Sequence, residues 1–198
     1  MKAILISIQP KWVEKIASGE KTIEVRKTRP KLETPFKCYI YATKPKKWFR
    51  FSSWGYASNE SLWLSNGKVK MCDGFEFWAD GIEYEPLCGK VIGEFVCDRI
   101  TDISVVVRNC NEDYNRVYHN DECKGSCLTW KELQDYGKGR TLYGWHISNL
   151  VIYDKPKELR EFKVKKLIER SVGFNRYEKK PLTRPPQSWC YVEQESKQ

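Results

Sequence analysis

The first part of the chain alternates between strand and helix signals over short spans. The apolar run "AILISIQ" predicts a strand, and "PKWVEKIASGE" spaces its apolar residues as in a helix that begins at Pro10 and ends at Gly19. Strands are predicted at 3–9, 22–27 and 37–44. No glycine-rich phosphate loop or dinucleotide fingerprint follows any of them.

Longer strand signals follow in the second half of the chain. The stretch 89–107 is rich in β-branched residues, and 141–156 is predicted as a strand that Pro156 stops. Between them, Thr129 and Glu132 have the spacing of a capping box, so a helix is predicted to begin there. Short helices among strands of increasing length predict an α+β fold, a mixed β-barrel rather than a doubly wound sheet.

Two stretches exceed a compact barrel. Residues 45–86 lack a clean periodicity and are rich in Trp, Tyr and Phe, which predicts a small aromatic lid or subdomain over the core. The tail is charged and carries prolines ahead of Trp189 and Tyr191, so it is predicted to lie extended on the surface with these rings as anchors. The predicted organisation is one domain over 1–160, with that insertion, and a C-terminal extension over 161–198 that packs on it.

The charge balance is basic. Lys and Arg number 35 against 26 Asp and Glu, which gives a formal net charge of +9. A basic balance favours polyanionic partners such as nucleic acid, although it also serves solubility. No stretch approaches the roughly 20 apolar residues of a membrane span, and no secretory signal pattern is present. We therefore expect a cytoplasmic protein that does not associate with a membrane.

The chain has eight cysteines, which are expected to be reduced. Cys38 and Cys97 lie within apolar strand signals and are predicted to be small buried side chains. One segment gathers possible zinc ligands, namely Cys110, His119, Cys123 and Cys127. Because the segment has no paired C-x-x-C, free thiols are the expected state, with a structural zinc as the alternative. No metal and no cofactor are predicted.

The stretch "SGEKTIEVRKTRP" combines a strand pattern with an unusual polar face. With a period of two, Ile23 and Val25 point one way, and Glu24 and Arg26 point the other. Lys21 stands at the turn that opens the strand. A solvated sheet edge carrying a surface ion pair would look like this, and so would a binding cleft.

Five stretches of the chain occur in a family's characteristic order. They are "SIQPKWVEKIASGEKTIEVRKTRP", "CYIYATKP", "CGKVIGEFVCD", "LTWKELQDYGKG" and "YGWHISNLVIYDKPKEL". This order resembles the ASCH domain family, a branch of the PUA-like β-barrels, in an elaborated form of bacterial or phage type. The most specific element is G-x-K-x-x-E-x-R, here Gly19, Lys21, Glu24 and Arg26. The resemblance implies a pseudo-barrel with a polar cleft beside the first helix.

The resemblance also implies a range of activities. Similar proteins have been proposed to bind RNA, and some relatives act on nucleic acid or on modified nucleosides. One compact branch is an amidohydrolase for cytidine acylated on its exocyclic amine, and it uses a lysine at the position of Lys21. That branch carries threonine where this chain has Glu24, and its further catalytic glutamate has no match here.

The first hypothesis is therefore a module that binds RNA or a modified nucleoside or nucleotide. Arg26 would contact a phosphate or base edge, and Glu24 would accept from a base amine or orient Arg26. Lysines would add positive potential, and an aromatic ring would offer a face to a base. The predicted ligand-binding residues are Lys11, Lys21, Glu24, Arg26, Tyr41 and Trp145.

The alternative hypothesis is a hydrolase, either an amidohydrolase on acylated cytidine-type nucleosides or a ribonuclease. Lys21 would act as nucleophile or base if burial lowered its pKa, although neighbouring carboxylates oppose that shift. Glu24 would otherwise be the general base, with Arg26 stabilising the negative charge that develops. Lys21 and Glu24 are thus the candidate catalytic residues, and binding is the preferred hypothesis.

Overall fold

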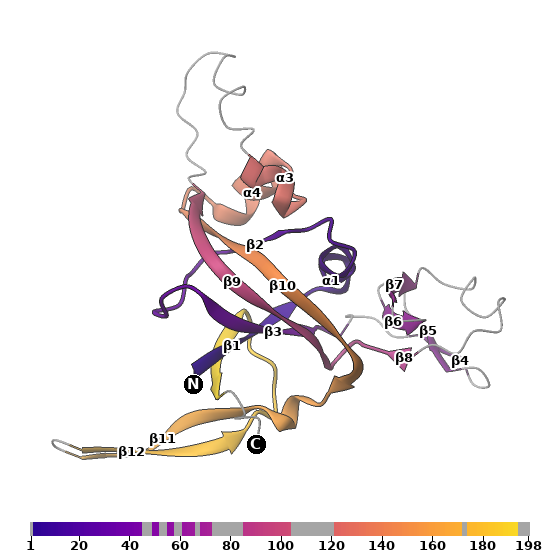
Figure 1. The fold of residues 1–198 in the computed structure, drawn as a ribbon. Coiled ribbons are helices and arrows are strands. Elements are labelled where there is room, and N and C mark those ends of the chain that lie inside the picture. The colour runs from indigo at the N-terminus through magenta and orange to yellow at the C-terminus, as the bar shows by residue number, and fades with distance from the viewer. Residues whose placement is uncertain are drawn as a thin grey trace.

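An eight-stranded mixed sheet forms the body of the protein in a computed structural model of the chain (Figure 1). The structure describes residues 2–44, 49–51, 55–57, 61–65, 68–72, 85–103, 121–171 and 174–193. Short helices lie around the long strands, which confirms the predicted α+β class.

The sheet has a single linear strand order. From edge to edge its strands are β12 (Phe174–Pro181), β11 (Lys163–Ser171), β13 (Trp189–Glu193), β1 (Lys2–Ile8), β3 (Phe36–Ala42), β9 (Val91–Ile103), β10 (Leu142–Lys157) and β2 (Ile23–Arg26). Neighbouring β1 and β3 are parallel, and the other neighbours are antiparallel. The sheet is mixed and curved as predicted, but over the described residues it stays open, with β12 and β2 as edges.

Two of the described helices, α1 (Pro10–Ala17) and α4 (Trp130–Gly137), lie where the sequence predicts them. The helix α3 (Asp121–Ser126) and a short 3-10 helix, η2 (Leu159–Glu161), were not predicted. In the predicted capping box of α4, the Glu132 amide donates to Thr129 Oγ1, and the Thr129 amide donates to the Glu132 carboxylate. Within the described residues, no helix is long and apolar enough to cross a membrane.

The insertion contributes short strands to two small separate sheets. These strands are β4 (Phe49–Phe51), β5 (Gly55–Ala57), β6 (Ser61–Ser65), β7 (Lys68–Cys72) and β8 (Glu85–Pro86). Leu62 of β6 is fully buried and joins the main apolar core beside Leu87. Most aromatic residues that suggested a lid lie outside the described residues, and nothing is described of the side chains of Tyr56 in β5 and Trp63 in β6, so the lid stays a prediction.

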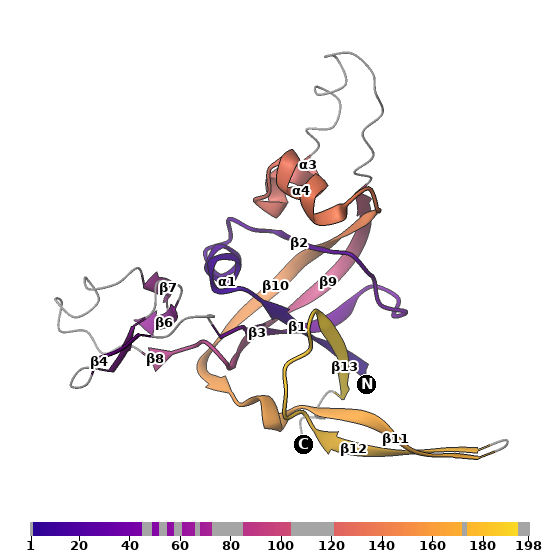
Figure 2. The ribbon, with the colours of Figure 1, turned by 180° about the vertical axis from the view of Figure 1, so that it is seen from behind.

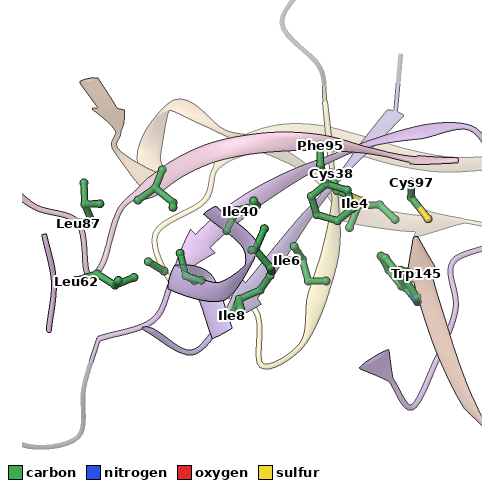
Figure 3. Packing of buried hydrophobic residues seen from close by; sticks show 14 of the residues in the cluster. Ile4, Ile6, Ile8, Cys38, Ile40, Leu62, Leu87, Phe95, Cys97 and Trp145 are labelled. Carbon is green, nitrogen blue, oxygen red and sulfur yellow. The ribbon is translucent and has the colours of Figure 1, made fainter. Parts of the chain in front are cut away.

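Alternation along β1 sends apolar side chains to both faces of the sheet. Ile4, Ile6 and Ile8 enter one core, and Ala3 and Leu5 enter a second core on the opposite face. Figure 3 shows the first core, which α1 covers and which also contains Cys38, Cys97 and Trp145. Both cysteines are fully buried and unpaired, as predicted.

The chain beyond β9 departs from the predictions in two places. Pro156 lies inside β10 and does not stop it, since the pairing with β9 is irregular there and a missing N–H is tolerated. The charged tail forms the hairpin of β11 and β12, which the sequence did not predict because lysine-rich segments are poor strand formers.

The predicted anchors of the tail both make contacts. Trp189 Nε1 donates to Thr28 Oγ1 at 3.0 Å, and the Tyr191 hydroxyl accepts from the Lys31 amide at 2.8 Å. They belong to β13, which pairs with β1 inside the main sheet instead of lying over it. The proposed domain boundary at residue 160 stays a prediction.

Candidate functional site

Strand β2 places its apolar and polar residues on opposite faces, as its alternation predicts. Ile23 and Val25 pack with Leu133 of α4. The register with β10 sets Glu24 opposite Trp145. Because residues opposite one another in an antiparallel pair share a face, the polar side of β2 faces the core that contains this indole.

The polar residues of β2 and its turn are buried. Exposed fractions are 2% for Lys21, 6% for Glu24 and 8% for Arg26. The interpretation as a solvated sheet edge is therefore wrong, because these side chains are shielded from solvent. Charged groups this buried need partners. These three residues are called the charged row below.

Glu24 links the two cations of the charged row. Its Oε1 lies 3.0 Å from Arg26 Nη2, and its Oε2 lies 3.6 Å from Lys21 Nζ. Arg26 Nη2 also donates to the Ser7 carbonyl at 2.6 Å, and Lys21 Nζ donates to the Ser126 carbonyl at 2.5 Å. With all three groups ionised, the charged row holds one positive charge in excess.

The C-terminal segment closes over the arginine end of the row. Arg26 Nη1 donates to Ser188 Oγ at 3.3 Å. This segment is fixed to β1, because the Ser7 amide donates to the Ser188 carbonyl and Ser7 Oγ donates to the Pro186 carbonyl. Arg26 is thus enclosed by residues far away in the sequence.

Burial and charge act in opposite directions on Lys21. Removal from water lowers the pKa of the Lys21 ammonium, whereas the neighbouring Glu24 carboxylate raises it, and burial is the larger cause. The pKa of Lys21 therefore lies below its ordinary value of 10.5. A lysine in this condition gives up its proton more readily than one in water.

Two buried N–H groups, one in the charged row and one beside it, have no hydrogen-bond partner among the described residues. They are Arg26 Nε and Trp145 Nε1. Trp145 is fully buried, and its ring contacts Phe36 and Trp189 at centroid distances of 5.8 Å each. Since Trp145 stands opposite Glu24, it is the diagonal neighbour of Arg26 on the same face.

Of the other predicted ligand-binding residues, Lys11 contacts the same indole as Lys21, whereas Tyr41 lies on the other face of the sheet. Lys11 is exposed on α1, and its Nζ lies 4.6 Å from the Trp12 ring centroid. Lys21 Nζ lies 5.1 Å from the centroid of the same ring, so both amines make cation–π contacts with one indole. Tyr41 is buried in the second core, on the opposite face of the sheet, because the alternation of β3 directs it there.

Sequence reasoning missed the serines that enclose the row. Ser7, Ser126 and Ser188 supply its carbonyl and hydroxyl partners from three separate segments. Serine is common and carries no motif here, so no local signal pointed to them. Trp12, which packs partly buried against the first core, was not among the predicted site residues, and its neighbour Lys11 was the available hint of a cation–π contact.

The candidate zinc ligands fall mostly outside the described residues. Cys110, His119 and the side chain of Cys123 are among those not described. Cys127 Sγ donates to the Glu20 carbonyl at 3.4 Å. The described residues contain no group of three or more His, Cys, Asp or Glu side chains arranged to hold a metal ion.

Comparison with known proteins identifies the family. The model of the ASCH domain matches residues 6–170. The chain belongs to the ASCH domain family. The ASCH match includes α1, the charged row and both long strands, and it runs into β11. ASCH domains form a PUA-like superfamily associated in general with RNA binding and hydrolytic activity.

Solved ASCH structures share the fold. The crystal structure of ASCH from Zymomonas mobilis is 17% identical, with a TM-score of 0.53, and the match covers 96% of this chain and 87% of that one. A tyrosine-to-phenylalanine mutant of it has the same identity and TM-score, over 98% of this chain and 91% of that one. A serine-to-alanine mutant has a TM-score of 0.51 at 17% identity, over 96% and 88%. No curated protein sequence matches this ASCH domain significantly.

Proposed function

We propose that the charged row binds an anionic, base-containing ligand, either RNA or a nucleotide. The observation that carries the proposal is the pair of buried, unpartnered N–H groups, Arg26 Nε and Trp145 Nε1, beside a row with excess positive charge. A buried donor without an acceptor costs about 1–3 kcal/mol. A ligand oxygen that accepts from these groups would recover that cost and neutralise the row.

Each residue of the row has a role suited to its contacts. Arg26 directs Nη2 at Glu24 and Ser7, which leaves Nε for a phosphate or carbonyl oxygen of the ligand. Glu24 holds both cations in place and has the acceptor capacity for a base amine. Lys21 supplies a second positive charge, and a bound anion raises its pKa.

A ligand that reaches Arg26 in the charged row meets the side chain of Ser188, which encloses it. The Ser188 hydroxyl bonds Arg26 at 3.3 Å, which is long for a hydrogen bond to a charged donor. A phosphate oxygen in its place would form a shorter, stronger bond. Ligand binding by this route displaces the side chain of Ser188 and leaves the Glu24–Arg26 pair intact.

Calorimetric titration with cytidine monophosphate, cytidine and a short RNA tests the proposal. Hydrogen bonds to charged groups contribute about 1.5–3 kcal/mol, so Arg26→Gln should weaken nucleotide binding about tenfold or more. Arg29→Gln removes the same charge from an exposed position on the same segment and serves as the control. RNA affinity should fall steeply as salt rises, whereas cytidine should respond little. Unchanged binding in both Lys21→Ala and Arg26→Gln would show that the row is not the binding site.

A second candidate is hydrolysis of an acylated nucleoside or of RNA, and the lowered pKa of Lys21 favours it. As a neutral amine, Lys21 takes a proton from a water that attacks the acyl carbonyl. The new C–O bond forms, the C–N bond to the base amine breaks, and that nitrogen takes up the proton. Arg26 stabilises the oxyanion of the intermediate.

Mass spectrometry of acylated cytidines and of an RNA oligonucleotide tests for turnover. Product that forms with the wild type and is lost in Lys21→Ala, but persists in Arg29→Gln, would establish hydrolysis. Absence of product, together with saturable nucleotide binding, would leave a binding module. If neither turnover nor nucleotide binding is observed, both candidate functions are rejected.

A further inference from the structure

The hairpin of β11 and β12 projects from the body of the protein (Figures 1 and 2). Every residue of β12 is exposed. Four large apolar or aromatic side chains of the hairpin are well exposed, at 40% for Leu167 and 51% for Ile168 of β11, and 65% for Phe174 and 57% for Tyr177 of β12. These side chains contribute nothing to a folded core while they are exposed to solvent. Exposed apolar side chains that cluster in this way mark interaction surfaces.

The hairpin is also strongly basic. Between Lys163 and Pro181 it carries seven Lys and Arg against two Glu. Like charges repel one another, so the many Lys and Arg side chains of this hairpin raise its electrostatic free energy unless a polyanion or solvent screens them. The combination of basic and aromatic side chains is typical of surfaces that bind a nucleic-acid strand.

Strand register separates the charges onto two faces. Lys165 stands opposite Lys179, and Leu167 stands opposite Tyr177. A bulge between Leu167 and Glu169 keeps Arg170 on the side of these pairs. This side, called the basic face, consists of Lys163, Lys165, Leu167, Arg170, Tyr177 and Lys179.

The two glutamates of the hairpin lie on the other face. There Glu169 stands opposite Arg176, and Glu178 forms an ion pair with Lys180 at 3.1 Å. Among the residues that the structure describes, the basic face meets one carboxylate, that of Glu193 of β13, which pairs with Lys165 and Lys179 at the base of the hairpin. Beyond that base, the described residues place no carboxylate opposite Arg170, which faces Asn175.

We propose that the basic face binds a single nucleic-acid strand. Tyr177 stacks on one base, and Lys163 and Arg170 contact phosphates on either side of it. A strand rises about 3.3 Å per residue, so Lys163 lies roughly 13 Å from the Leu167–Tyr177 pair along the hairpin, and Arg170, which stands opposite Asn175, lies roughly 7 Å from the pair on the other side. A duplex is excluded by the stacking contact, because its bases already stack on each other. This role goes beyond the charged row and does not depend on it.

Fluorescence anisotropy with a labelled oligouridylate of about 16 nucleotides tests the basic face. Lys163→Ala with Arg170→Ala removes two charges from it, and Lys166→Ala with Arg176→Ala removes two from the opposite face of the same hairpin. Long-range attraction changes equally in both double variants. The slope of log affinity against log salt should fall by about 1.4 in the first, at about 0.7 per phosphate contact, and little in the second.

Substitution of Tyr177 tests the stacking contact. Tyr177→Ala should weaken oligouridylate binding about tenfold, and Tyr177→Phe should retain it because the ring face remains. Equal losses of slope in the two double variants, or unchanged affinity in Tyr177→Ala, would overturn the proposal.

The proposals for the two sites can be refuted independently of each other. Variants of the basic face should leave cytidine monophosphate binding unchanged. If the charged row is not a site, that titration shows no binding while the effects of the hairpin variants on oligouridylate persist.

Discussion

Glu24 is predicted to be the residue on which the charged row depends. Glu24→Gln removes the carboxylate 3.0 Å from Arg26 Nη2 and 3.6 Å from Lys21 Nζ, and leaves two cations that are at most 8% exposed. Loss of one partner from a buried ion pair costs about 3–5 kcal/mol, so the free energy of unfolding at neutral pH should fall by about that amount. Glu20→Gln is the control, because Glu20 pairs with Lys15 in solvent and its loss should matter little.

The pH dependence of this loss follows from Lys21. Because burial lowers the pKa of Lys21 in the folded protein, the unfolded protein binds more protons between that pKa and 10.5, and stability rises with pH there. Glu24 is the main group that raises the pKa of Lys21, so in Glu24→Gln this rise should begin at lower pH and be larger.

Urea unfolding of wild type, Glu24→Gln and Glu20→Gln, from neutral pH to about pH 10, measures both effects. A loss below about 1 kcal/mol at neutral pH, with a pH profile parallel to that of the wild type, would refute the reasoning. The row would then behave as a solvated ion pair.

Three further predictions concern the scaffold. Thr129→Ala removes the side-chain acceptor that caps α4 and should lower the free energy of unfolding by about 1 kcal/mol, as measured by urea denaturation. Gly93→Ala would place a Cβ against the carbonyl oxygen of Val151 and should destabilise the protein by about 1–3 kcal/mol in the same assay. Burial raises the pKa of Cys97 to about 12, so iodoacetamide should label Cys97 only after unfolding, as read by peptide mass spectrometry.

Local patterns predicted the local parts of the site. The alternation of "TIEVR" placed Glu24 and Arg26 on one face, and the Pro10 and Gly19 signals set the limits of the helix beside it. These features depend on backbone periodicity and turn chemistry, which a few neighbouring residues determine. The polar face was predictable, but its burial was not.

Long-range contacts account for what the sequence did not predict. Ser188 reaches Arg26 across 162 positions, and the Lys21–Ser126 contact spans 105. Tyr41 was chosen for its chemistry, yet the parity of its position on β3 directs it to the opposite core. The hairpin of β11 and β12 was missed because cross-strand pairing, not intrinsic propensity, stabilises its lysine-rich strands.

The most direct test of the central claim is the pair of unpartnered donors. Proton–nitrogen NMR spectra, recorded while cytidine monophosphate is added, report the Arg26 Nε–H and Trp145 Nε1–H signals, which Arg26→Lys and Trp145→Phe assign by their disappearance. We predict that both signals shift with one shared midpoint while the Arg29 signal stays in place. If neither signal moves at ligand concentrations that saturate binding, the nucleotide binds elsewhere and the charged row is not its site.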